Sequence, residues 1–288
     1  MSIDVPKDRQ DAGAQLLSSE RHGARINREF WRSGRGLAEY ANRTLEPVEA
    51  ILLMRYAEQL RGDVLEVGCG AGRVLGYVAN VAHEAWGIDL SPAMVEYCER
   101  NYPNAHVAVG DIVALDGVLG GRRFDVVLAV NNVLDVFDDA DRRRVLIALG
   151  ALIAPSGLLI FSSHNLGSVA GGGSNGADGR PQMASLLAAI GERRLGDLLG
   201  APWRLAVRKR NRRLLGSLEH TAADHAIVND RAHDYGLLHY YIRRDDQERQ
   251  LAEAGYELVE CVDANGRSVP AGTDPTDPWL HYVARLVA

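Results

Sequence analysis

The sequence DVLEVGCGAGRVLGYVANVAHEAWGID, residues 63–89, decides the fold. It begins with a short apolar run, passes through a turn containing Gly68, Gly70 and Gly72, and continues with apolar residues at helical spacing. A second strand-like run then ends at Asp89. This order of strand, glycine turn, helix, strand and acid predicts a βαβ unit that binds a nucleotide. The glycines allow close approach of the backbone, and the acid can accept hydrogen bonds from ribose hydroxyls.

The spacing of the glycines argues against the two common phosphate-binding patterns. A dinucleotide fingerprint has its third glycine three positions after the second, where this chain has Arg73. The third glycine instead comes one residue early, at Gly72, and no GxxxxGK[ST] phosphate loop occurs in the chain.

VLEVGCGAG (64–72) followed by GIDLSPAMVEYC (87–98) resembles the first two motifs of the class I S-adenosylmethionine methyltransferases. The donor of these enzymes carries no phosphate, so the turn has to leave room for a methionine tail. The resemblance implies an α/β fold: a Rossmann-like, seven-stranded, mostly parallel sheet with helices on both faces. It also implies that Gly68, Gly70, Arg73 and Asp89 bind S-adenosylmethionine.

Four further positions are assigned to the adenine by the same resemblance. Leu90 and Met94 would flank the ring, although Met94 is equally suited to the core. Asp111 would accept a hydrogen bond from the adenine amino group, and Ile112 would supply its backbone amide. Asp111 can alternatively cap a turn, as aspartate after glycine commonly does.

The segment YANRTLE (40–46) resembles the pre-core segment that folds over the donor in glycine N-methyltransferase-like enzymes. Tyr40 lies in this segment, and Arg43–Thr44 matches the pair that binds the donor carboxylate there. A guanidinium suits a carboxylate because it donates two parallel hydrogen bonds. The alternative is that Arg43 is an ordinary surface arginine.

Two polar sequences follow predicted buried strands. FDVVLAV (124–130) ends in Asn131 and Asn132, at the strand end where open α/β sheets bind ligands. The resemblance places Asn131 near the methionine part of the donor and Asn132 toward the methyl acceptor, or both cap the next turn. LLIFSS (158–163) ends before His164, which we expect to be catalytic as a base or to orient the acceptor.

The segment HDYGLLHYYI (233–242) predicts a strand in addition to those of the alternating strand–helix pattern. His239 and Tyr240 are further candidates for binding the acceptor. If the segment is extended, Tyr240 faces opposite to His239 and Tyr241. We assign no metal site, because Cys69, Cys98 and Cys261 share no metal-ligand spacing.

The predicted domains are an N-terminal tail (1–27), a methyltransferase core (28–165 and 240–288) and an inserted substrate cap (166–239). The core would close with a helix, a strand and a reversed final strand over residues 279–286. Within the cap, residues 204–213 carry six Lys or Arg and no acid, which favours either a solvated helix face or contact with an anion.

Composition narrows the partners. A net charge of −6 argues against nucleic acid, and the chain has no apolar run of membrane-spanning length and no signal-peptide pattern. An odd number of cysteines favours a reduced, cytoplasmic setting, and a homo-oligomer is compatible with these features. We expect transfer of a methyl group to oxygen or nitrogen of a polar small molecule (a sugar, amino compound or secondary metabolite), leaving S-adenosylhomocysteine. The alternative is an RNA or protein methyltransferase that uses residues 204–213.

Overall fold

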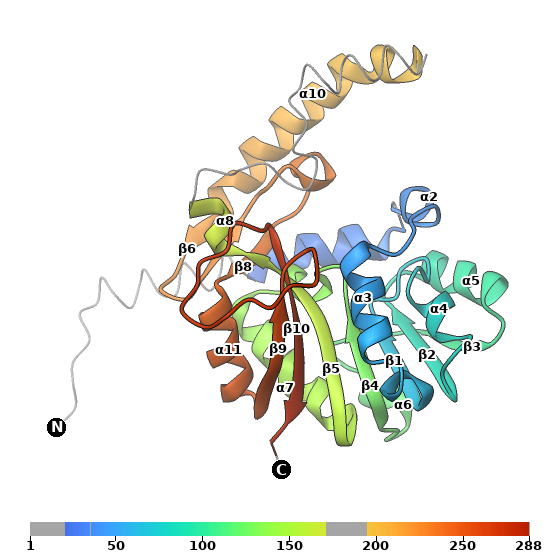
Figure 1. Cartoon of the computed structure of the whole chain (residues 1–288). Coiled ribbons are helices and arrows are strands. Elements are labelled where there is room, and N and C mark those ends of the chain that lie inside the picture. The colour runs from blue at the N-terminus through green and yellow to red at the C-terminus, as the bar shows by residue number, and fades with distance from the viewer. Residues whose placement is uncertain (1–20, 35, 171–194, 288) are drawn as a thin grey trace.

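A computed structural model describes residues 21–34, 36–170 and 195–287 and shows an α/β fold around one large sheet (Figure 1). Seven strands form the core of this sheet, in the order β3-β2-β1-β4-β5-β10-β9. Strand β10 is antiparallel to both of its neighbours, and the other six are parallel. This confirms the expected mostly parallel sheet with a reversed last strand. Their bounds are β1 Asp63–Val67, β2 Glu84–Asp89, β3 Ala105–Val109, β4 Phe124–Ala129, β5 Ile153–Asn165, β9 Tyr256–Val262 and β10 Trp279–Leu286.

Helices cover both faces of the sheet, because alternate residues of the buried strands point to opposite sides. Val64 packs in one apolar cluster with α3, α4 and α5, whereas Leu65 packs in another with α6, α7 and α11. The bounds are α3 Pro47–Arg55, α4 Leu75–Val78, α5 Pro92–Asn101, α6 Asp116–Leu119, α7 Asp139–Leu152 and α11 Arg244–Glu253. Shorter elements are α2 Leu37–Tyr40, η1 Gln59–Arg61 and η2 Val133–Val136. Among the described helices, none is long and apolar enough to cross a membrane.

The insert after β5 extends the sheet instead of forming a separate layer. Strand β8 runs parallel to the last residues of β5, with His164 opposite Tyr241, and β7 and β6 follow antiparallel. Since Trp279 of β10 also pairs with His164, β8 lies on the other side of β5, beyond the end of β4. The insert contains α8 Leu166–Ala170, α10 Leu195–Leu215, η3 Gly216–Leu218, β6 His220–Thr221, β7 His225–Val228, η4 Ala232–Tyr235 and β8 His239–Ile242.

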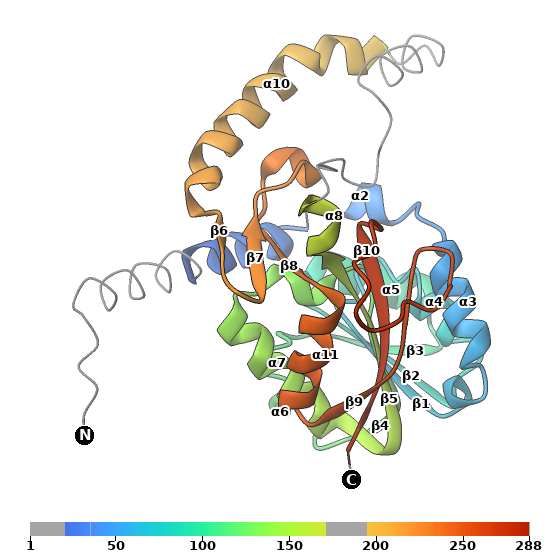
Figure 2. The ribbon, with the colours of Figure 1, turned by 60° about the vertical axis from the view of Figure 1, so that its left-hand side comes forward.

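The expected boundary between cap and core, at residues 239 and 240, therefore falls inside one strand. Helix α10 reaches away from the sheet in both views (Figures 1 and 2). Residues 171–194 of the expected cap lie outside the described residues.

The last part of the expected N-terminal tail (1–27) is helical in the structure. Residues 21–32 form a helix, and the Asn27 side chain is 2% exposed. Its amide donates to the carbonyls of Val136 (2.9 Å) and Leu238 (2.6 Å) and accepts from the Leu238 amide (3.0 Å). A buried amide with three partners fixes this helix against the insert. Residues 1–20 lie outside the described residues.

Candidate active site

A cavity of about 1700 Å³ lies at the carboxyl ends of β1, β2, β4 and β5, the edge where open α/β sheets bind ligands. Its lining contains every residue assigned to the donor: Tyr40, Arg43, Gly68, Gly70, Arg73, Asp89, Leu90, Met94, Asp111, Ile112 and Asn131. His164, Asn132 and His239 line the same cavity, so the fold brings the donor and acceptor candidates together.

The turn after β1 requires glycine for two different reasons. Gly68 has a φ of +66°, and a Cβ there would lie 2.1 Å from Cγ2 of Val133. Gly70 has a φ of +53°, but a Cβ there would meet no atom within 4 Å. The backbone amide of Gly70 donates to Oδ2 of Asp89 at 2.8 Å. The other oxygen of Asp89, Oδ1, accepts from the Ser91 amide at 2.8 Å. Burial raises the pKa of Asp89 while these amide bonds oppose the rise, and the carboxylate fixes the turn beside the cavity.

Glu66 is a cavity residue that the sequence analysis did not select. It is 4% exposed, and its Oε2 has no hydrogen-bond partner within the described part of the chain. Burial, together with the charge of Glu49, raises its pKa well above the ordinary value. A buried carboxyl oxygen without a partner is costly, so a cationic group of a ligand suits this position. The available signal was an acid inside an apolar strand, two residues before the first glycine.

Tyr40 and Arg43 of the segment before the core line the cavity. The guanidinium of Arg43 lies over the Tyr40 ring, 4.4 Å from its centroid. Arg73 forms a two-bonded ion pair with the buried Glu49, with Nη2 to Oε1 at 2.7 Å, and also donates to the Thr44 carbonyl. Thr44 therefore contacts Arg73 through its backbone carbonyl, which accepts this hydrogen bond.

Asp111 makes one contact that the sequence analysis considered and one that it did not. One oxygen accepts from the Val113 amide at 3.1 Å, which is the turn-capping role. The other forms an ion pair with Arg28 of the N-terminal helix, and both residues line the cavity.

Asn131 and Asn132 follow β4 in the left-handed region, with φ of 57° and 58°. Asparagine tolerates this region better than most residues. The Asn132 amide N–H donates to Oγ of Ser162 at 2.8 Å, and the side chain makes no cap on the next turn. Its Oδ1 is buried and has no partner among the described residues, so it can accept a bond from a ligand.

His164 is held by a carboxylate that the sequence did not reveal. Its Nδ1 lies 2.6 Å from Oδ2 of Asp135 in η2, and its backbone amide donates to the same oxygen at 2.6 Å. The other Asp135 oxygen accepts from Arg142 (2.5 Å) and from Oγ of Ser163 (2.7 Å). Burial would raise the pKa of Asp135, but Arg142 and His164 outweigh it and keep the pKa low. A charged Asp135 fixes the ring and leaves Nε2 of His164 available.

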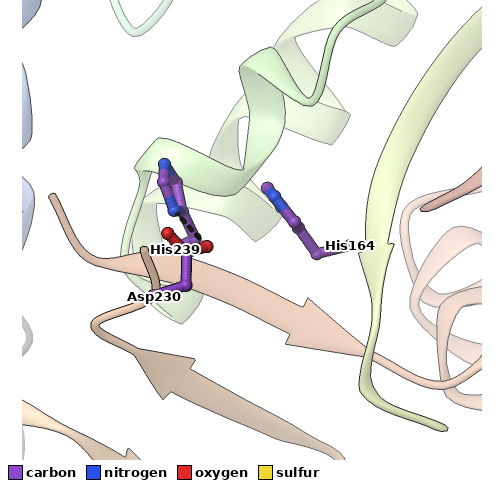
Figure 3. Close-up of side chains that lie close together, drawn as sticks. All are labelled: His164, Asp230 and His239. Atoms are coloured by element: carbon purple, nitrogen blue, oxygen red, sulfur yellow. Dashed lines mark hydrogen bonds and ion pairs between the residues drawn. The ribbon is translucent and has the colours of Figure 1, made fainter. Parts of the chain in front are cut away.

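His239 forms a second pair of this kind. Its Nδ1 lies 2.8 Å from Oδ2 of Asp230, which also accepts from the Tyr241 hydroxyl at 2.9 Å. The imidazole rings of His164 and His239 stack with centroids 4.9 Å apart (Figure 3). Burial would lower the pKa of His239, but the charge of Asp230 more than compensates and raises it.

Tyr240 is a correction to the predicted site. It does not line the cavity, is fully buried, and donates from its hydroxyl to Asp139 at 2.6 Å. Its ring stacks on His225, and the guanidinium of Arg142 lies 4.6 Å from its centroid. The predicted alternation explains the result, because His239 and Tyr241 take the cavity side of β8.

The basic stretch 204–213 contributes to the cavity from α10. Arg208 pairs with Asp234 at 2.6 Å, and Arg212 pairs with Glu219 at 2.8 Å. Arg204, Arg208 and Arg212, spaced by one helical turn each, all line the cavity.

Comparison with known proteins agrees with this geometry. Residues 64–157 match a family described as a methyltransferase domain. A probable S-adenosylmethionine-dependent methyltransferase of Mycolicibacterium smegmatis is 28% identical over 116 residues, which are 40% of this chain and 43% of that protein. A ubiquinone biosynthesis O-methyltransferase of Coxiella burnetii is 30% identical over 120 residues, which are 39% of this chain and 49% of that protein. The chain thus spans less than half the length of these relatives.

Solved structures show the same fold. The 1,6-didemethyltoxoflavin-N1-methyltransferase of Burkholderia thailandensis, solved with 1,6-didemethyltoxoflavin and S-adenosylhomocysteine bound, superposes with a TM-score of 0.53. The match covers 99% of this chain and 94% of that one, at 16% identity. The central sheet thus has the fold of this solved methyltransferase. Residues 64–157, which begin with the glycine turn, are the part of the chain that matches a methyltransferase domain.

Proposed function

We propose that this protein transfers the methyl group of S-adenosylmethionine to an oxygen or nitrogen of a polar small molecule, such as a sugar, an amino compound or a secondary metabolite. One observation carries the proposal. A single cavity contains the glycine turn with Asp89 and, on the neighbouring strand ends, a histidine oriented by the buried Asp135. S-adenosylmethionine, when bound, supplies a methyl group already activated by a positively charged sulfur, so the protein mainly aligns the two reactants.

The cavity fits the methionine and ribose parts of the donor. The open space beside Gly70 gives room for the ligand to approach the backbone, and Asp89 accepts bonds from the ribose hydroxyls. The unpartnered Oε2 of Glu66 accepts a hydrogen bond from the α-ammonium group of the donor. This group is the cation that a buried, unpartnered carboxyl oxygen requires. Arg43 donates to the carboxylate, and Asn131 lies beside the methionine part.

The adenine is assigned to the far end of the same turn. Leu90 and Met94 pack on the two faces of the ring, and Asp111 with the Ile112 amide bonds its edge. The ion pair between Arg28 and Asp111 brings the N-terminal helix to this position, so the helix covers the base.

At the acceptor end, Nε2 of His164 takes the proton of a hydroxyl as the methyl group is transferred. Asp135 holds the other ring nitrogen and stabilises the imidazolium that forms, while Asn132 and His239 bind the acceptor. An amine that is already neutral needs no base, so there His164 and Asn132 serve to orient it.

Two arginines of the basic stretch support a small acceptor over RNA or protein. Arg208 and Arg212 pair with acids of the insert and line the cavity, so their charges are already balanced beside the candidate site. Two of the three similar proteins cited above are named for ubiquinone biosynthesis and for 1,6-didemethyltoxoflavin, and ubiquinone and 1,6-didemethyltoxoflavin are small molecules. The cytoplasm suits the three cysteines, which are free and buried.

Calorimetric titration with S-adenosylmethionine and S-adenosylhomocysteine tests the donor site. Incubation with pooled hydroxyl and amine acceptors, followed by detection of S-adenosylhomocysteine, tests the transfer. We expect binding of both ligands and acceptor-dependent product formation. Absence of heat with either ligand contradicts the proposal, and turnover of RNA in preference to every small acceptor selects the alternative.

A further inference from the structure

Two imidazoles and one carboxylate meet at the acceptor end of the cavity. His164 is the second-last residue of β5, Asp230 lies between β7 and β8, and His239 begins β8. One ligand atom from each lies within 4.8 Å of the others. Figure 3 shows the three side chains gathered between these strands. Two histidines and a carboxylate with open positions are typical of sites for divalent first-row transition metals. We propose that His164, Asp230 and His239 bind a divalent transition-metal ion such as Zn²⁺.

The hydrogen bonds already present identify the ligand atoms. Nδ1 of His164 is held by Asp135, which leaves Nε2 for the ion. Nδ1 of His239 and Oδ2 of Asp230 are 2.8 Å apart. Because metal–ligand distances are about 2.0–2.2 Å, adjacent ligand atoms lie roughly 3 Å apart. The ion therefore replaces the proton between Oδ2 of Asp230 and Nδ1 of His239. Nε2 of His164 is the third ligand.

Groups around the cluster are arranged as they are around metal centres. Histidine ligands usually donate their second ring N–H to a carboxylate, which is what His164 does with Asp135. The Tyr241 hydroxyl supports Asp230 in the same way, and its ring lies 4.7 Å from that of His164. These contacts fix two of the three ligands before any ion is bound.

Other histidine–carboxylate pairs in the protein lack this arrangement. His83 pairs with Asp63 at 2.7 Å on the surface, and His225 pairs with Asp224 at 2.8 Å inside the insert. Within the described residues, His164, Asp230 and His239 form the one group of three such ligands close enough for an ion. The exposed His83 pair is therefore a suitable control.

The effect of the ion on catalysis rests on the proposed function, although its binding does not. An ion at this end of the cavity would bind the acceptor oxygen at its open position and lower the pKa of the hydroxyl, so that its proton is released to water and the oxygen attacks the methyl group as an alkoxide. In that state Nε2 of His164 is a ligand, and the ion replaces it in activating the acceptor. The inference thus selects hydroxyl acceptors over amines.

Metal titration of the chelator-treated, dialysed full-length protein tests the site without donor or acceptor. Co²⁺ is followed by visible absorption and Zn²⁺ by calorimetry. We expect one ion per chain, with affinity reduced at least about tenfold in His164→Asn, His239→Asn and Asp230→Asn. The His83→Asn control should bind like the unmodified protein, and Mg²⁺ should not compete.

Failure to bind Co²⁺ and Zn²⁺ overturns the inference, and so does binding that survives both histidine substitutions. S-adenosylhomocysteine affinity and the melting temperature of each variant show whether it is folded. If a variant does not fold, Tyr241→Phe takes its place. This substitution removes the hydroxyl that supports Asp230, and we expect a several-fold loss of metal affinity. A protein that binds metal but no S-adenosylhomocysteine keeps this inference and loses the proposed function.

Discussion

Asp89 holds the glycine turn through the Gly70 amide and is also proposed to bind the ribose of the donor. We expect Asp89→Ala to weaken S-adenosylhomocysteine binding by about 1 kcal/mol or more, because bonds from the ribose to a charged acceptor are lost. Calorimetry measures the change.

The matched control is Asp263→Ala. Asp263 also accepts from two backbone amides, those of Asn265 and Arg267, but does not line the cavity. Equal affinity in Asp89→Ala and the unmodified protein would remove Asp89 from the donor site.

His164 should affect turnover much more than donor binding. With an acceptor identified by the screen, we expect His164→Asn to slow turnover about 10²-fold or more, the usual contribution of a positioned base. S-adenosylhomocysteine affinity should change less than twofold, since Asn131, Asp89 and the glycine turn are untouched.

Unchanged turnover across a pH series would make His164 a structural residue. Treating the unmodified enzyme with chelator separates the two roles of this side chain. Loss of activity after chelation points to the ion, and full activity points to the free imidazole.

At the scale of single residues, a motif predicts chemistry only for groups that follow one another in sequence. The glycine turn led directly to Gly68, Gly70 and Asp89. Asp135 and Asp230 could not be found in this way, because each acquires its role from a histidine 29 or 9 positions later in the chain.

Among the elements, α7 depends on one buried arginine. Arg142 is fully buried and donates to Asp135 of η2, Ser163 of β5, and Gln247 and Gln250 of α11. We expect Arg142→Ala to lower the free energy of unfolding by about 3–5 kcal/mol, because it leaves Asp135 as an uncompensated buried charge.

Chemical unfolding of Arg142→Ala and Arg144→Ala compares two positions on the same helix. Arg144 is exposed and pairs with Asp141 one turn earlier, so its removal should cost no more than about 0.5 kcal/mol. Similar losses in the two variants would contradict a structural role for the buried pair.

Strand β8 shows how much an element reveals by itself. Its alternation places His239 and Tyr241 on one face and Tyr240 on the other. Which face of β8 is turned toward the cavity depends on the position of β8 beyond the end of β4. The residue pattern of the strand does not predict that position. Tyr240 was therefore the wrong choice, and Tyr241, which supports Asp230, was passed over.

For the whole molecule, the pH dependence of stability should carry a contribution from His281 in the middle of the sheet. It is 4% exposed, and burial with the nearby charge of Arg73 lowers its pKa to about 4. An unfolded histidine titrates near 6.5, so below that pH the unfolded chain binds a proton that the native protein does not. Stability present above pH 6.5 is then lost as the pH falls toward 4, by on the order of 3 kcal/mol.

Unfolding free energies of the unmodified protein and His281→Gln, measured from pH 7 to 4, test this. The substitution should flatten the decline, whereas His83→Gln, at an exposed histidine, should leave the slope nearly unchanged. Parallel curves for the protein and His281→Gln would show that the histidine does not titrate with unfolding.

The sequence by itself determined the βαβ unit, the mostly parallel sheet with its reversed last strand, and the residues that line the cavity beside the glycine turn. These features depend on local spacing: apolar periodicity, glycines at required backbone angles, and an acid at a strand end. The tertiary structure decided the end of the cavity proposed to bind the acceptor. There β8 lies along the last residues of β5 and beside η2, so that residues from three distant segments lie together. Contacts between such segments arise from packing and strand order, which no local pattern encodes.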